Sequence, residues 1–152
     1  MGAFAADERR YVRAARVGRL ATADADGRPH VVPVCTALVG DDLVTPIDEK
    51  PKDAPPDALR RVRDVEANPR VAVVFDHYVP DWSHLGWVQV RGAAAPLAPG
   101  DDGHGAAVAA LREKYDQYAD RALPERPVLR IAVDGVRSWG HLDAPETDGR
   151  RD

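Results

Sequence analysis

The chain contains short segments in which apolar residues alternate with polar or small ones, and this period of two is typical of β-strands. Residues 18–23 form one such segment, and residues 29–39 form a longer, mostly apolar strand segment; the sequence Asp-Ala-Asp-Gly at 24–27 separates the two. An Asp-Gly pair between two strands favours a tight β-hairpin. A second turn at 40–42 leads into another short apolar segment, residues 43–47. The pattern therefore predicts three consecutive antiparallel strands.

Two further segments of the chain are predicted to be helical. Residues 7–17 begin with Asp7 and Glu8, which suit a first helical turn, and one face carries Tyr11, Val12 and Ala15. Residues 106–118 have a similar helical composition. We expect a short helix in each segment.

A third helix is predicted over residues 58–67. Asp57 can cap its start, and the Asn-Pro pair at 68–69 ends it because the residue before a proline disfavours the α conformation. Its apolar face should carry Leu59, Val62 and Val65. The opposite face is predicted to carry the three arginines of this segment: Arg60, Arg61 and Arg63.

Further strands are predicted at residues 70–78, 87–97 and 128–133, the last with a turn at Asp134-Gly135 and a continuation to 141. About six mostly antiparallel strands with about three short helices indicate a mainly β (α+β) fold, a closed or split β-barrel rather than a doubly wound sheet. One domain should span residues 1–142, followed by a flexible tail at 143–152.

Composition and charge exclude several function classes. The 152 residues carry a net charge of -4, which argues against a general nucleic-acid-binding protein. The N-terminal ten residues lack the apolar core of a signal peptide, and no segment is apolar enough to span a membrane, so a cytoplasmic protein is expected. The single cysteine, Cys35, is expected to be a small buried residue of a strand. The five histidines show no ligand spacing, so no metal site is predicted.

The strongest candidate for binding chemistry is a lysine pair, Lys50 and Lys52, which follows the third predicted strand. The helix carrying Arg60 and Arg61 comes only a few residues later. Two ammonium groups and a guanidinium at the mouth of a barrel could bind a phosphate. The alternative is a solvated loop with scattered charges.

A second candidate segment, residues 76–87, concentrates two tryptophans and two histidines and is followed by the run Trp87-Val88-Gln89-Val90-Arg91-Gly92. Together with the turn, the lysine pair and the basic helix, it resembles the flavin/deazaflavin-binding split-barrel proteins, which are pyridoxamine 5'-phosphate oxidase-like. The closest resemblance is to the branch that uses the deazaflavin coenzyme F420. The run departs from the Gln-Val-Arg-Ile-Glu-Gly motif of pyridoxamine phosphate oxidases, so pyridoxamine phosphate is not expected as the substrate.

The resemblance implies an FMN-binding-like split barrel that forms a homodimer with two cofactor sites at its interface. It places the ring of the cofactor against two strand segments, and its anionic tail at the lysine pair and one of Arg60 or Arg61. The implied ring contacts are Val32, Pro33, Val34, Thr36, Thr45, Pro46 and Ile47. Thr45 and Ile47 could equally be ordinary strand residues.

The resemblance also implies that the segment after residue 76 lines the ring, generally from the second subunit. Tyr78, Trp82 and Trp87 are its candidates, although the two tryptophans could instead only fill the dimer interface. The implied activity is hydride transfer between F420 and a small organic substrate, with Tyr78, Asp76 and His84 as candidate proton donors. Two alternatives stay open, namely an FMN-dependent oxidoreductase and a non-catalytic flavin- or deazaflavin-binding protein.

Overall fold

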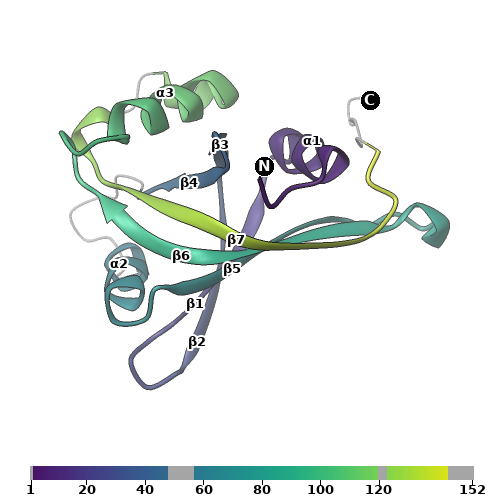
Figure 1. Ribbon diagram of the computed structural model, residues 1–152, viewed down its shortest axis with the longest axis horizontal. Helices are drawn as coiled ribbons and strands as arrows, with labels where there is room; N and C mark the ends of the chain where they lie inside the picture. The colour runs from purple at the N-terminus through teal and green to yellow at the C-terminus, as the bar shows by residue number, and fades with distance from the viewer. Residues whose placement is uncertain (1, 48–56, 120–122, 144–152) are drawn as a thin grey trace.

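The computed structural model describes residues 2–47, 57–119 and 123–143. In chain order these residues form the helices and strands drawn in Figure 1: α1 (Ala6–Ala14), β1 (Gly18–Ala23), β2 (Pro29–Val34), β3 (Ala37–Val39), β4 (Asp42–Pro46), α2 (Asp57–Ala67), β5 (Arg70–His77), the 3-10 turn η1 (Trp82–His84), β6 (Gly86–Leu97), α3 (His104–Lys114), the 3-10 turns η2 (Asp116–Tyr118) and η3 (Leu123–Glu125), and β7 (Val128–Gly140).

The described strands form one antiparallel sheet of seven, in the order β2-β1-β5-β6-β7-β4-β3. Its longest ladder joins β6 to β7 from the pair Gly86 and Gly140 to the pair Leu97 and Val128. The three α-helices pack against this strongly curved sheet (Figure 1). The fold is a split barrel of antiparallel strands with three α-helices, as the sequence predicts.

The two edges of the sheet, β2 and β3, are consecutive in the chain. Val34 of β2 pairs with Gly18 of β1, whereas Ala37 of β3 pairs with Val44 of β4. Only Cys35 and Thr36 lie between these strands. We call this two-residue connection the seam. The single strand predicted over residues 29–39 is therefore wrong, because the chain changes its pairing partner at the seam.

A second correction concerns β7, which was predicted to turn at Asp134-Gly135. The strand continues instead, and its register with β6 shifts between Arg91 and Gly92, so that Asp134 is the extra residue of a β-bulge. The bulged carboxylate accepts two hydrogen bonds from the guanidinium of Arg70, at 2.8 and 3.2 Å. The Asp-Gly pair thus forms a bulge, and the carboxylate of the bulged residue binds Arg70.

The hydrophobic core has two clusters of buried side chains. The larger one fills the barrel and includes Leu20, Leu43 and Phe75, while the smaller one lies under α3 and includes Leu111. Tyr11 and Val12 on α1 are buried, as predicted. The helices α1 and α3 are shorter than predicted, because the backbone becomes extended at residues 15 and 115. No helix among the described residues is long and apolar enough to cross a membrane.

Candidate functional site

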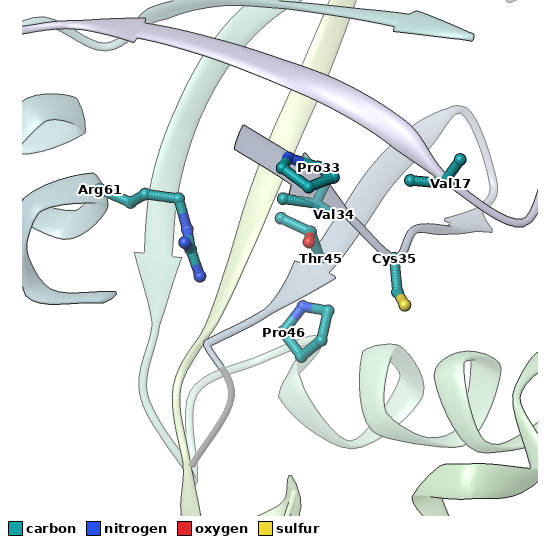
Figure 2. Close-up of a pocket in the computed structure, with 7 residues that line it drawn as sticks. All are labelled: Val17, Pro33, Val34, Cys35, Thr45, Pro46 and Arg61. Carbon is teal, nitrogen blue, oxygen red and sulfur yellow. The ribbon is translucent and has the colours of Figure 1, made fainter. Parts of the chain in front are cut away.

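A pocket of about 220 Å³ opens beside the seam (Figure 2). Its walls come from the end of β2, the seam, the end of β4 and the helix α2. The lining residues are Val17, Pro33, Val34, Cys35, Thr45, Pro46 and Arg61. The structure thus brings together five residues of the predicted cofactor site, namely Pro33, Val34, Thr45, Pro46 and Arg61.

Arg61 supplies the charged group of this pocket. Its side chain extends from α2 toward the other lining residues (Figure 2), and the residue is 8% exposed. The predicted grouping of Arg61 with the exposed arginines is wrong, because Arg61 lies one helical turn before the buried Val65 and shares its face. Arg63 is exposed. A permanently charged guanidinium held largely out of water is suited to bind a phosphate.

The position of α2 is fixed by a buried polar contact to the sheet. Thr22 Oγ1 of β1 donates a 2.8 Å hydrogen bond to Asp64 Oδ2, and both residues are nearly inaccessible to solvent. Arg60 Nε lies 3.8 Å from the same carboxylate oxygen. Arg60 therefore forms an ion pair with Asp64 and does not line the pocket, so that of the two predicted arginines only Arg61 does.

Thr45 gives the pocket a buried hydroxyl. The residue is 1% exposed, and its Oγ1 makes no hydrogen bond within the described part of the chain. A buried hydroxyl without a partner is energetically costly, so such a group in a pocket wall is suited to a ligand. The two neighbouring prolines, Pro33 and Pro46, have no N–H and present apolar surface.

Three further predicted contact residues lie close to the pocket in sequence without lining it. Thr36 is 1% exposed, and its backbone N–H donates to the hydroxyl of Tyr115 at 3.2 Å. Ile47 is buried, and its N–H donates to the carbonyl of Pro127 at 3.2 Å. Val32 packs against the larger core cluster. These three residues adjoin lining residues in the sequence, but their own contacts are with other parts of the protein.

The lysine pair, Lys50 and Lys52, lies outside the described residues. The last described residue before it is Ile47, which directly follows the pocket residue Pro46. Binding of an anion by these lysines stays a prediction.

The predicted aromatic residues lie at the other end of β5 from α2 (Figure 1). Tyr78 and Trp82 are 71% and 70% exposed, and Trp82 Nε1 donates a 3.0 Å hydrogen bond to the hydroxyl of Tyr78. Trp87 is half-buried and pairs across the ladder with Trp139, which is 54% exposed. None of these four side chains lines the pocket of its own chain.

The candidate proton donors are held by local contacts at the same end of the sheet. Asp76 accepts a 2.6 Å hydrogen bond from Arg19, and His84 Nδ1 lies 2.9 Å from Asp81 Oδ2. These contacts place no proton donor in the pocket. Within the described residues, no group of three His, Cys, Asp or Glu side chains is arranged to bind a metal ion.

Two pocket residues were missed by sequence reasoning. Val17 precedes β1 and is 38% exposed, and Cys35 lies at the seam rather than within a strand, where it is half-buried. The thiol is free. An exposed valine just before a strand is a weak signal, while the seam itself could be recognised only from the pairing of strands distant in sequence.

The split-barrel fold agrees with a comparison of the sequence with known families. The profile of the pyridoxamine 5'-phosphate oxidase family matches residues 5–140. The chain belongs to this family. A comparison with curated proteins found no match.

Solved structures with a similar fold include a protein of unassigned function and two heme proteins. A conserved hypothetical protein from Mycobacterium tuberculosis superposes with a TM-score of 0.71 at 21% identity, over 96% of this chain and 92% of that one. HutZ, the heme storage protein from Vibrio cholerae, has a TM-score of 0.65 at 18% identity, with coverages of 84% and 89%. A heme binding protein from Mycobacterium smegmatis has a TM-score of 0.65 at 23% identity, over 91% of this chain and 55% of its own. At these identities the likeness describes the fold alone.

Proposed function

We propose that this member of the family is an oxidoreductase that binds the deazaflavin coenzyme F420 beside the seam and transfers hydride between it and a small organic substrate. The single observation that carries the proposal is the largely buried guanidinium of Arg61 in a pocket with apolar walls. This arrangement suits a ligand that joins a flat ring to an anionic tail.

The residues present fit both parts of such a ligand. Pro33, Val34 and Pro46 would contact the face of the ring, and the hydroxyl of Thr45 would bond to one of its polar atoms. Arg61 would bind the nearest anionic group of the tail, and Lys50 and Lys52, which follow the pocket in sequence, would bind the anions beyond it. The hydroxyl of Thr45 makes no hydrogen bond within the described residues, and this supports a polar contact to the ligand at this wall.

The number of cations favours F420 over FMN. FMN has one terminal phosphate, which two of these cations would satisfy. The tail of F420 carries a phosphodiester and glutamate carboxylates, so Arg61, Lys50 and Lys52 would each find an anion. FMN is the alternative cofactor of the same site, because it also joins a flat tricycle to a phosphate.

When bound, the reduced deazaflavin supplies a hydride from ring carbon C5 to an electrophilic double bond. The chain's own residues then have to bind and orient the cofactor and exclude water from the ring. Of the candidate proton donors, Asp76 and His84 belong to the exposed end of the sheet, as does Tyr78. They would reach a substrate only from a second subunit.

We therefore propose a homodimer. The end of the sheet that carries Tyr78, Trp82, Trp87 and Trp139, here called the aromatic end, covers the pocket of the partner protomer. The pocket in one chain is smaller than the range of about 300–1,000 Å³ that is typical of complete small-molecule sites. Tyr78, Trp82 and Trp139 expose large apolar surfaces that a dimer would bury.

The decisive experiment is a side-by-side titration of the purified protein with F420, FMN and hemin, followed by fluorescence quenching. We expect F420 to bind at least about tenfold more tightly than either alternative. Tighter binding of FMN by the same factor would overturn the choice of cofactor. Hemin is included because two of the structural neighbours are described as heme proteins. Tighter binding of hemin than of F420 would contradict the proposal.

A second measurement separates an enzyme from a carrier. The bound, reduced F420 is mixed with a panel of enones and quinones, which carry electrophilic double bonds, and its reoxidation is followed by absorbance. Reoxidation that depends on one of these compounds and saturates with its concentration is expected of the enzyme. Tight binding of F420 without any such reoxidation would instead indicate a non-catalytic binding protein.

A further inference from the structure

A second cavity, with a different lining from the cofactor pocket, adjoins β3, the strand that follows the seam. It has a volume of about 430 Å³, which is within the usual range for small-molecule sites. Its lining comes from α1, β3 and α3, and in Figure 1 the strand β3 lies between these two helices. The lining residues are Arg13, Ala37, Leu38, Ala110, Glu113 and Lys114, none of which belongs to the proposed cofactor site.

The two kinds of lining residue define the chemistry of a ligand. Ala37, Leu38 and Ala110 form an apolar surface that would accept a hydrocarbon body. Arg13 and Lys114 add two positive charges, and Glu113 adds one negative charge. Such a site favours a ligand with one negative charge at the end of an apolar group.

Lys114 provides the second, independent observation. Its Nζ is buried and makes no hydrogen bond within the described part of the chain. Nearby lie the ring of Tyr115, whose centroid is 5.3 Å from this Nζ, and the guanidinium of Arg16, which donates a 3.0 Å hydrogen bond to the carbonyl of Lys114. Neither group can accept a hydrogen bond in the way that a carboxylate would.

The charges around Lys114 also favour the binding of an anion. Burial, together with the positive charge of Arg16, lowers the pKa of Lys114 to about 8, although Cys35 opposes the shift. The hydroxyl of Tyr115 is already used, since it donates to the carbonyl of Arg16 at 3.0 Å and accepts from the N–H of Thr36 at 3.2 Å. An arriving anion would therefore supply the acceptor that the ammonium group lacks.

We propose that this cavity is a second ligand site, which binds a small monocarboxylate with an apolar body. The carboxylate is held between Lys114 and Arg13, and the body rests on Ala37, Leu38 and Ala110. Glu113, which is exposed, repels any second negative charge on the ligand. The site takes a different class of molecule from the cofactor and shares no lining residue with the pocket beside the seam.

The test is a titration of the ¹⁵N-labelled, cofactor-free protein followed by NMR, with three probes that separate the two requirements. Phenylacetate has both the anion and the apolar body, acetate has only the anion, and benzyl alcohol has only the body. Phenylacetate should bind saturably and shift the amide signals of Ala37, Leu38 and Ala110. Acetate and benzyl alcohol should bind at least about tenfold more weakly.

The phenylacetate affinities of single variants then show which positively charged side chain binds the probe. Lys114→Met and Arg13→Gln should each weaken phenylacetate binding about tenfold, as expected when one charge-assisted hydrogen bond is lost. Arg10→Gln is the matched control, because Arg10 is an exposed cation of the same helix as Arg13 and does not line the cavity. Its affinity for phenylacetate should be unchanged. Arg13→Gln tests the same cavity from an exposed residue, independently of any change that Lys114→Met makes to the protein interior.

Three results would overturn the proposal. One is binding of benzyl alcohol as tight as that of phenylacetate, and another is unchanged affinity in both cavity variants. The third is a shift confined to the amides of Val34, Cys35 and Thr45, which would place the probe in the cofactor pocket. Failure of the protein to bind F420 would leave the outcome here unaffected, because the two sites are tested with different ligands.

Discussion

Thr22 of β1 and Asp64 of α2 are joined by a buried hydrogen bond of 2.8 Å, 42 residues apart in the sequence. This bond ties α2 to β1, in addition to the packing of Val62 and Val65 in the core. Arg61 lies three residues before Asp64 on the same helix, so its guanidinium reaches the pocket only while the helix keeps this position. A contact remote from the ligand thus positions the charge that we propose binds it.

Thr22→Val should destabilise the protein by about 1–3 kcal/mol, because it leaves the buried carboxylate of Asp64 without its hydroxyl donor. Urea unfolding measures this change. Thr36→Val is the matched control, since Thr36 is equally buried and its hydroxyl makes no hydrogen bond within the described residues. Equal stability of the two variants would show that the Thr22 bond contributes nothing.

Arg61→Gln should weaken the binding of F420 by about tenfold or more, because one charge-assisted contact to the anionic tail is lost. Arg63→Gln removes the same charge from an exposed position of the same helix and should leave the affinity unchanged. Both affinities are measured by fluorescence titration, and thermal unfolding checks that each variant is folded. An equal loss in both variants would indicate a general effect of charge rather than a contact.

Lys50→Ala combined with Lys52→Ala should weaken F420 binding at least about tenfold, since two potential charge-assisted contacts to the tail are removed. The affinity of the parent protein should also fall as salt is raised, and the double variant should show a smaller salt dependence. The measurement is the same titration at several ionic strengths. If the double variant binds as tightly as the parent, the lysines belong to a solvated loop.

Lys114 should make stability depend on pH in a defined direction. Its pKa is lowered to about 8 in the folded protein, from an ordinary value of 10.5. Between these values the unfolded chain holds a proton that the folded protein has released, so the free energy of unfolding should rise from pH 8 to pH 10.5. Lys114→Met should remove this rise and add on the order of 2 kcal/mol of stability at pH 7. Urea unfolding across this range tests it; an unchanged slope in Lys114→Met would contradict it.

Trp82→Ser combined with Trp139→Ser should shift the protein from dimer to monomer, because both side chains are more than half exposed in one chain. Sedimentation at micromolar concentration measures the change. Val31→Ser serves as the control, since Val31 is 61% exposed but lies on the edge strand β2, away from the aromatic end. A parent protein that sediments as a monomer while it binds cofactor would place the whole site within one chain.

Much of the fold could be predicted because local signals agreed with the final pairing. The bounds of β1 are those predicted, and the turn after it is closed by Gly27, which has a positive φ of 82° and donates to the carbonyl of Asp24 at 2.9 Å. The buried face of β5 carries Val71, Val73 and Phe75, which alternate in the sequence. At these positions the local sequence pattern and the tertiary packing favour the same backbone conformation.

The errors occur where tertiary structure decides between equally good local choices. A mostly apolar run crosses the seam with no Gly or Pro to mark a boundary there, and the different pairing partners of Val34 and Ala37 divide it into two strands. The same holds at Asp134, where an Asp-Gly pair suits both a turn and a bulge, and the contact with Arg70 accompanies the bulge. At Arg61, a long side chain reaches a pocket from the buried face of its helix, which a simple division into polar and apolar faces does not anticipate.

The seam also determines how the barrel is closed. Elsewhere in the described sheet, neighbouring strands are joined by ladders of hydrogen bonds, but β2 and β3 are held near each other by two covalently linked residues. Thr36 of this connection is buried, and its N–H donates to the hydroxyl of Tyr115, the residue that follows α3. The barrel is therefore closed here by the chain itself and by a contact to the end of a helix, and not by a strand ladder. The proposed cofactor site lies at this closure.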